Sequence, residues 1–158
     1  MNLVSKILPA DNVVVDLDVG SKKLLFEHIA QLFETHQGIP RSKVLDSLLA
    51  REKLGSTGLG HGIAIPHGRL KGLKEASGAF IKTRSPIPFD APDGQPVNLL
   101  FALLVPEQAT DFHLQILGEL AQVLSDKRMR EQLLASTDPT HIHQLLTGWS
   151  PATRQSSK

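Results

Sequence analysis

The sequence predicts an α/β fold in which a mixed sheet of about four to five strands carries helices on both faces. Apolar, β-rich runs alternate along the chain with segments whose apolar residues recur at helical spacing. The connection between the runs 76–83 and 97–105 is too short for a helical crossover, so these two strands should pair antiparallel. A chain of 158 residues, 41% of them hydrophobic, suits one domain, which we expect over residues 1–149.

Local signals predict the elements of the first half. A short helix or turn near 3–8 precedes the β-branched segment 12–17, which has the composition of a strand. Ser21 is expected to cap a helix that ends at Gly38, and Pro40 should start the next helix. The apolar stripes of these two helices consist of Leu25, Ile29, Leu32 and Phe33, and of Val44, Leu45, Leu48 and Leu49.

The second half contains the strand that we expect at the centre of the sheet, 97–105. The run 86–96 before it holds four prolines and an Asp-Gly turn signal, which predict a loop or a sheet edge. Thr110 or Asp111 should cap a long helix, a shorter helix should follow around 129–134, and Asp138 with Pro139 should start the last one. The polar segment 150–158 is expected to be a disordered tail.

The composition excludes several classes of function. The net charge of +1 provides no global field that would recruit nucleic acid or an anionic membrane, so no nucleic-acid partner is expected. The absence of cysteine excludes disulfides and thiolate sites. The N-terminus lacks a signal-peptide pattern, and no apolar stretch approaches the roughly 20 residues that span a bilayer. We therefore expect a cytoplasmic protein without membrane insertion.

The most informative segment is 54–68, a glycine-rich run that ends in a histidine directly after Pro66. Its glycines at positions 55, 58, 60 and 62 permit positive φ angles and close backbone approach, so that successive N–H groups can line a concave surface suited to a phosphate. Pro66 restricts the direction in which His67 follows the preceding strand.

Two common chemistries fit these residues poorly. His61, His67 and His113 could hold zinc, but no acidic residue accompanies them at a ligand-like spacing, so neither a metal nor another cofactor is expected. Ser56 and Thr57 could act as nucleophiles, but a Gly-x-Ser-x-Gly elbow is absent. A nucleophilic histidine remains, because neutral imidazole can carry a phosphoryl group at physiological pH.

The segment also carries a resemblance to a known family. Glu52 together with 59–68 resembles the phosphorylation-site signature of the mannitol/fructose-type enzyme IIA domains of the bacterial phosphoenolpyruvate-dependent phosphotransferase system. The flanking residues 51–58 and 62–69, and the single stand-alone domain, resemble the nitrogen-regulatory branch of that family. The similarity covers nearly the whole chain and implies the enzyme IIA fold.

The resemblance implies a role for individual residues. His67 would be the phosphoryl acceptor, modified at its Nε2 (tele) nitrogen, although the sequence alone does not decide between the two ring nitrogens. Arg51 matches the active-site arginine of the family, and His113 matches its second pocket histidine. No role is implied for His61. The residues expected to bind the phosphoryl group through hydroxyl or backbone donors are Ser56, Thr57, Gly58 and Gly60.

The implied function is that of a phosphocarrier in a nitrogen-type phosphotransferase chain. An HPr-like phosphocarrier protein would supply the phosphoryl group, and the phosphorylation state would select regulatory partners linked to potassium uptake and to nitrogen or carbon metabolism, without independent turnover of a small molecule. One alternative is a sugar-specific enzyme IIA that passes phosphate to a fructose or mannitol IIB domain. Another is a binding module with an inactive site. Leu54, Leu59, Ile63 and Phe112 are expected to be either docking contacts or members of the core.

Overall fold

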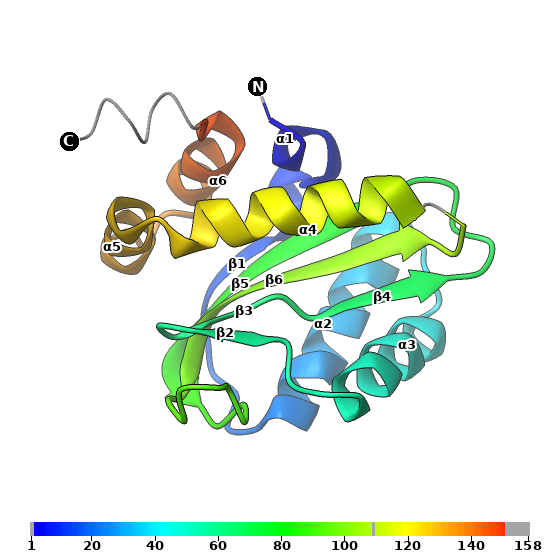
Figure 1. The fold of residues 1–158 in the computed structure, drawn as a ribbon, viewed down its shortest axis with the longest axis horizontal. Coiled ribbons are helices and arrows are strands. Elements are labelled where there is room, and N and C mark those ends of the chain that lie inside the picture. Colours follow the sequence, from blue (N-terminus) through cyan, green and yellow to red (C-terminus); the bar gives the residue numbers. More distant parts are fainter. Residues whose placement is uncertain (1, 109, 151–158) are drawn as a thin grey trace.

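A six-stranded mixed β-sheet lies between two layers of helices in the computed structural model, which describes residues 2–108 and 110–150 (Figure 1). The predicted α/β class, the mixed sheet and the helices on both faces are confirmed. The elements in chain order are α1 (Val4–Ile7), the 3-10 turn η1 (Ala10–Asn12), β1 (Val13–Leu17), α2 (Lys22–Gln37), α3 (Arg41–Lys53), β2 (Gly58–Gly60), β3 (Ile63–Ala64), β4 (His67–Leu70), β5 (Ser77–Ile87), β6 (Val97–Pro106), α4 (Thr110–Ser125), α5 (Lys127–Ala135) and α6 (Pro139–Gly148).

The sheet is organised around β6. Its strand order is β1-β5-β6-β3-β2, and β4 also pairs with β6. β5 and β6 are antiparallel, as predicted from the short connection between them, whereas β1 is parallel to β5. β3 and β4 share one edge of β6 and run parallel to it, with β3 opposite Leu99 and Leu100 and β4 opposite Leu103 to Pro106.

The side chains of β6 contribute to both hydrophobic cores, so the prediction of a central strand at 97–105 is confirmed. Leu99, Phe101, Leu103 and Val105 pack with apolar residues of α1, α4, α5 and α6. Leu100, Ala102 and Leu104, on the opposite face, pack with residues of α2 and α3. A strand covered on both faces needs a nearly continuous apolar sequence, and 97–105 shows this pattern with Asn98 as its one polar residue.

Several predicted helix ends are confirmed. Ser21 Oγ accepts a hydrogen bond from the Leu24 N–H at the start of α2, and Gly38 ends that helix with φ 69°. Asp138 caps α6 by accepting from the Thr140 N–H over 3.0 Å. The α4 prediction differs slightly, because the helix begins at Thr110 and both expected caps therefore lie inside it.

The sequence underestimated the number of strands. The segment 54–68 is not one loop, since it contains β2 and β3 and ends at the start of β4. β5 also extends to Ile87, through Pro86 and beyond the predicted loop boundary. The β5–β6 register is interrupted between Lys82 and Ile87, so the missing N–H of the proline falls where the ladder is irregular.

Trp149, the last residue of the predicted domain, follows α6 and is buried in the core. Most of the predicted tail, 151–158, lies outside the described residues. Among the described helices, none has both the length and the apolar character that crossing a bilayer requires.

Candidate active site

His67 opens β4 at the edge of the sheet, opposite Leu103 of β6. The chain reaches it from β3 through a short bend at Ile65 and Pro66. The Ile65 N–H donates to the Thr57 carbonyl over 3.0 Å, and the Pro66 carbonyl accepts from the Leu103 N–H over 2.9 Å. Pro66 therefore leads His67 into a strand, whereas the sequence suggested that it leads it out of one.

The two ring nitrogens of His67 have different partners. Nδ1 lies 2.8 Å from the Ile65 carbonyl oxygen, which can only accept, so Nδ1 carries the proton in the neutral ring. Nε2 then holds the lone pair, and it accepts from Nε of Arg51 over 3.3 Å. Arg51 is itself held by a 2.8 Å hydrogen bond from Nη1 to the Gly55 carbonyl. The nucleophilic nitrogen therefore faces a guanidinium.

Arg51 reaches this position because α3 packs very closely on β4. A Cβ on Gly68 would collide with Oγ of Ser47 and lie 3.1 Å from its Cβ, so any larger residue there requires α3 to shift. Ser47 Oγ also donates to the Arg69 carbonyl over 3.0 Å. Arg51 is one helical turn beyond Ser47 and lies on the same side of α3, next to the residue that precedes Gly68.

His113 reaches the site from α4, on the face of the sheet opposite to α3. It lies in the first turn of α4 and is 8% exposed, and its ring meets that of His67 edge to face, with centroids 5.4 Å apart. Figure 1 shows the first turns of α4 beside the ends of β4 and β6. Arg69, two residues after His67 on β4, donates from Nε to His113 Nδ1 over 3.4 Å.

The structure brings together three sequence-predicted residues, His67, Arg51 and His113. Sequence reasoning did not propose Arg69. The signal that could have found it is the two-residue period of a strand, which puts His67 and Arg69 on the same face of β4.

Both histidines favour the neutral state. Burial is the largest cause that lowers the pKa of His67, and the charges of Arg51 and Arg69 lower it further, against opposing effects of the Ile65 hydrogen bond and Glu52. Burial also lowers the pKa of His113, followed by the charges of His67, Arg69 and Arg51. A neutral imidazole keeps the lone pair that a nucleophile needs.

The predicted hydroxyl donors form part of the loop framework. Thr57 donates to Glu52 through both Oγ1, over 2.6 Å, and its backbone N–H, over 3.1 Å. Ser56 Oγ donates to the Phe89 carbonyl over 2.9 Å and accepts from the Gly58 N–H over 3.1 Å. Binding of a phosphoryl group by Ser56, Thr57 and Gly58 would require these hydrogen bonds to rearrange. Their role in phosphoryl binding stays a prediction.

Gly60 ends β2, and His61 and Gly62 form the turn between β2 and β3. Gly60 has φ +89°, and the backbone N–H of His61 donates to Asp93 Oδ2 over 3.0 Å. A role for Gly60 in phosphoryl binding likewise stays a prediction. The His61 side chain is exposed.

Glu52 is a buried carboxylate whose role the sequence did not reveal. Its side chain is 6% exposed and accepts from Lys22 Nζ over 3.0 Å, in addition to its two hydrogen bonds from Thr57. Lys22 lies 4.5 Å from the centroid of the Phe89 ring. Glu52 thereby connects α2, the end of α3 and the loop before β2.

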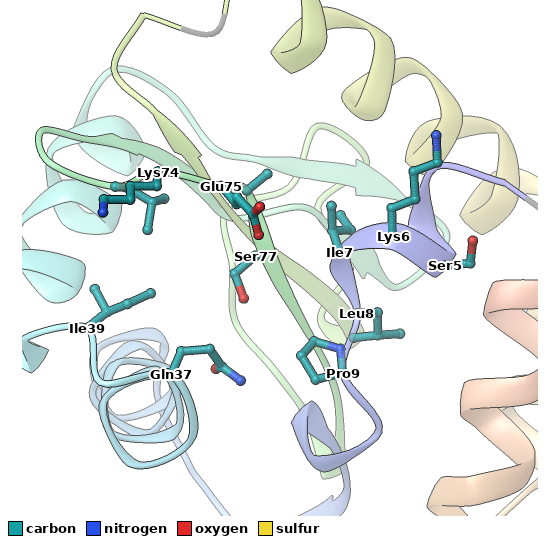
Figure 2. Close-up of a pocket in the computed structure, with 12 residues that line it drawn as sticks. Ser5, Lys6, Ile7, Leu8, Pro9, Gln37, Ile39, Lys74, Glu75 and Ser77 are labelled. Carbon is teal, nitrogen blue, oxygen red and sulfur yellow. The ribbon is translucent and has the colours of Figure 1, made fainter.

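Two other features of the structure are the placement of its metal-ligating side chains and a cavity away from His67. Within residues 2–108 and 110–150, no group of three or more metal-ligating side chains is arranged to hold an ion. A cavity of about 560 Å³ lies between α1, the end of α2 and the β4–β5 loop (Figure 2). Neither histidine of the pair lines it, and its charged lining residues, Lys6, Lys74 and Glu75, are of both signs.

Comparison with known families defines the class of this α/β protein as a phosphotransferase component. The family model described as "Phosphoenolpyruvate-dependent sugar phosphotransferase system, EIIA 2" matches residues 6–148. The chain therefore belongs to the EIIA type 2 family.

Within this family the chain is similar to nitrogen regulatory proteins. The one from Escherichia coli (strain K12) is 44% identical over 128 residues, 80% of this chain and 78% of the relative. The one from Pseudomonas aeruginosa is 40% identical over 144 residues, 90% of this chain and 94% of the relative. The crystal structure of nitrogen regulatory protein IIA-Ntr from Neisseria meningitidis matches with a TM-score of 0.88 and 51% identity, covering 92% of this chain and all of that one.

A sugar-specific relative is also similar. The fructose-specific EIIA component from Haloferax volcanii is 33% identical over 144 residues, 90% of this chain and 94% of the relative.

Proposed function

We propose that this protein is a cytoplasmic phosphocarrier of a nitrogen-type phosphotransferase chain. It accepts a phosphoryl group on Nε2 of His67 from an HPr-like phosphocarrier protein. Its phosphorylation state then regulates partner proteins, such as regulators of potassium transport and of nitrogen or carbon metabolism. Its role is group transfer between proteins, without turnover of a free small molecule.

The observation that carries this proposal is the environment of the His67 ring. The Ile65 carbonyl holds the proton on Nδ1, so the lone pair lies on Nε2, next to the guanidinium of Arg51. A nucleophile beside a fixed cation suits phosphoryl transfer, in which the protein mainly positions the groups and neutralises the transferred charge.

The transfer balances without moving a proton. The Nε2 lone pair of His67 attacks the phosphorus atom of a phosphohistidine on the donor protein, and a new P–N bond forms as the donor's P–N bond breaks. The bonding electron pair returns to the donor ring, which carries a proton on its other nitrogen and therefore leaves as a neutral imidazole. Nδ1 of His67 keeps its proton, and the Ile65 carbonyl stabilises the positive charge that the ring acquires.

Arg51 and His113 act on the transferred group from two sides. Arg51 exchanges its 3.3 Å hydrogen bond to Nε2 for bonds to the phosphoryl oxygens, which its fork geometry suits. His113, whose ring lies 5.4 Å from that of His67, donates to another phosphoryl oxygen.

Phosphorylation would switch the protein by changing the charge of a partly apolar surface. A phosphoryl group adds about two negative charges at this site. Leu54 and Leu59, which are exposed, are the docking contacts we retain from the sequence. Ile63 is 1% exposed and belongs to the core, which is the other role expected for it, and Phe112 packs against the same core.

Reconstitution tests the proposal directly. The protein is incubated with phosphoenolpyruvate, enzyme I and an HPr-type carrier, and its intact mass is measured before and after mild acid. We expect an acid-labile gain of one phosphoryl group in the wild type and none in His67→Ala. A wild-type protein that gains no acid-labile phosphoryl group, although the carrier is phosphorylated, would refute the proposal.

A sugar-specific enzyme IIA is the second candidate, favoured by the similarity to the fructose-specific relative. The phosphorylated protein is offered to a purified fructose-type IIB domain. Rapid loss of its phosphoryl group to IIB would favour this second candidate over the regulatory role.

A further inference from the structure

The third residue of β4 has a contact that the proposed function does not yet use. His67 and Arg69 lie on the same face of β4, and the backbone of Arg69 is fixed by Ser47 Oγ, which donates to the Arg69 carbonyl over 3.0 Å. From this anchored position the Arg69 side chain reaches His113, with Nε 3.4 Å from Nδ1.

This contact determines which nitrogen of His113 carries the proton. The Nε–H of arginine can only donate, so Nδ1 of His113 must accept, and the neutral ring carries its hydrogen on Nε2. His67 is the reverse case, with its proton on Nδ1 and its lone pair on Nε2. The two neighbouring rings of His67 and His113 are thus held in opposite tautomers. The lone pair of each ring accepts a hydrogen bond from a different arginine.

We propose that Arg69 is a positioning residue that holds His113 as the Nε2–H tautomer, so that the ring offers a neutral hydrogen-bond donor to a phosphoryl group on His67. The inference rests on the proposed function, because the donor matters only if His67 is phosphorylated. In the other tautomer, Nε2 would present a lone pair that repels the phosphoryl oxygens.

The surroundings of His113 support a neutral donor. The side chain is buried in the first turn of α4, and burial lowers its pKa, as do the charges of His67, Arg69 and Arg51. Arg69 therefore has two effects on the His113 ring. Its hydrogen bond to Nδ1 leaves the proton on Nε2, and its charge disfavours protonation of Nδ1.

Ring nitrogen NMR tests the tautomer without any phosphoryl donor, so its outcome is separate from that of the phosphocarrier proposal. In the ¹⁵N-histidine-labelled protein at neutral pH, we expect His113 to show a protonated Nε2 and a hydrogen-bonded, unprotonated Nδ1, and His67 to show the reverse. In Arg69→Leu, the Nδ1 resonance of His113 should shift to that of a nitrogen without a donor, while the His67 pattern persists. A proton on Nδ1 of His113 in the wild type would overturn the inference.

The transfer assay then links the tautomer to function. Arg69→Leu should slow phosphorylation of His67 by up to about 100-fold, the loss that a misplacement of about 1 Å can cause. The matched control is Lys71→Leu, which removes an exposed cation just beyond β4 and should leave both the rate and the His113 resonances unchanged. If Arg69→Leu slows transfer while the His113 resonances stay as in the wild type, or if it leaves the rate unchanged, Arg69 is not a positioning residue.

Discussion

The rings of His67 and His113 meet edge to face, with their centroids 5.4 Å apart and their planes at 84°. One ring belongs to an edge strand and the other to a helix on one face of the sheet, so the pair forms only when both layers are assembled. Each ring accepts a hydrogen bond from one arginine. The behaviour of this four-residue group can be measured in several independent ways.

The two histidines should make the protein less stable in acid than at neutral pH. Their pKa values in the folded state lie below the ordinary histidine value of about 6.5, so below that pH the unfolded chain binds protons first. This stabilisation is complete above about pH 6.5 and is lost as the pH falls through the folded-state values, with a slope of up to about 1.4 kcal/mol per pH unit for each histidine.

Urea unfolding between pH 7.5 and pH 5 measures this slope. The double variant His67→Asn/His113→Asn should give a flatter dependence than the wild type over the same interval. Equal slopes for the two proteins would show that neither histidine is kept neutral by the fold.

Replacement of Arg51 should affect both the rate of phosphorylation and its pH dependence. Arg51→Leu removes a donor that faces the phosphoryl oxygens, and we expect a rate about 10- to 100-fold lower at pH 7.5. It also removes a charge that lowers the pKa of His67, so the acid limb of the pH–rate profile should move to higher pH. Lys43→Ala, an exposed cation at the other end of α3, is the control. A lower rate with an unmoved acid limb would contradict this account of His67.

Gly68→Ala should destabilise the protein and slow phosphorylation together. The new Cβ would lie 3.1 Å from Cβ of Ser47 and 3.3 Å from its backbone carbon, so α3 must move away from β4 and carry Arg51 with it. We expect a loss of about 1–3 kcal/mol in the free energy of unfolding, the usual range for overpacking.

Gly118→Ala is the matched glycine control for that experiment. This glycine is exposed within α4 and has no atoms near its missing Cβ, so alanine should stabilise the protein by roughly 0.5–1 kcal/mol. Equal effects of the two substitutions would mean that α3 does not depend on the close approach at Gly68.

Removal of the Glu52 carboxylate should loosen the loop before β2. Glu52→Ala leaves Lys22 and the two donors of Thr57 without their shared acceptor, which should cost about 3 kcal/mol in the free energy of unfolding. A double-mutant cycle with Lys22→Met apportions the ion pair, because Met keeps much of the stem that lies over Phe89. An Ala variant as stable as the wild type would show that the buried network contributes nothing.

Much of the fold could be predicted because its signals are local. Ser21, Gly38 and Asp138 mark helix ends through their own side-chain or backbone chemistry. The apolar run 97–105 indicates a strand buried on both faces whatever its neighbours are. The short strands within 54–68 could not be predicted, because two to four residues form a strand only where a distant partner, here β6, offers a free edge.

The sequence by itself determined the order of the helices and of β1, β5 and β6, the central strand, the family resemblance and the candidate nucleophile. Each of these is written in contiguous residues. Only the tertiary structure decided which nitrogen of His67 is unprotonated, because that depends on the Ile65 carbonyl and on an arginine from α3. It also decided that Arg69 contacts His113. Hydrogen bonds act over about 3 Å, and groups far apart in the chain come within that distance only when the strands and helices pack.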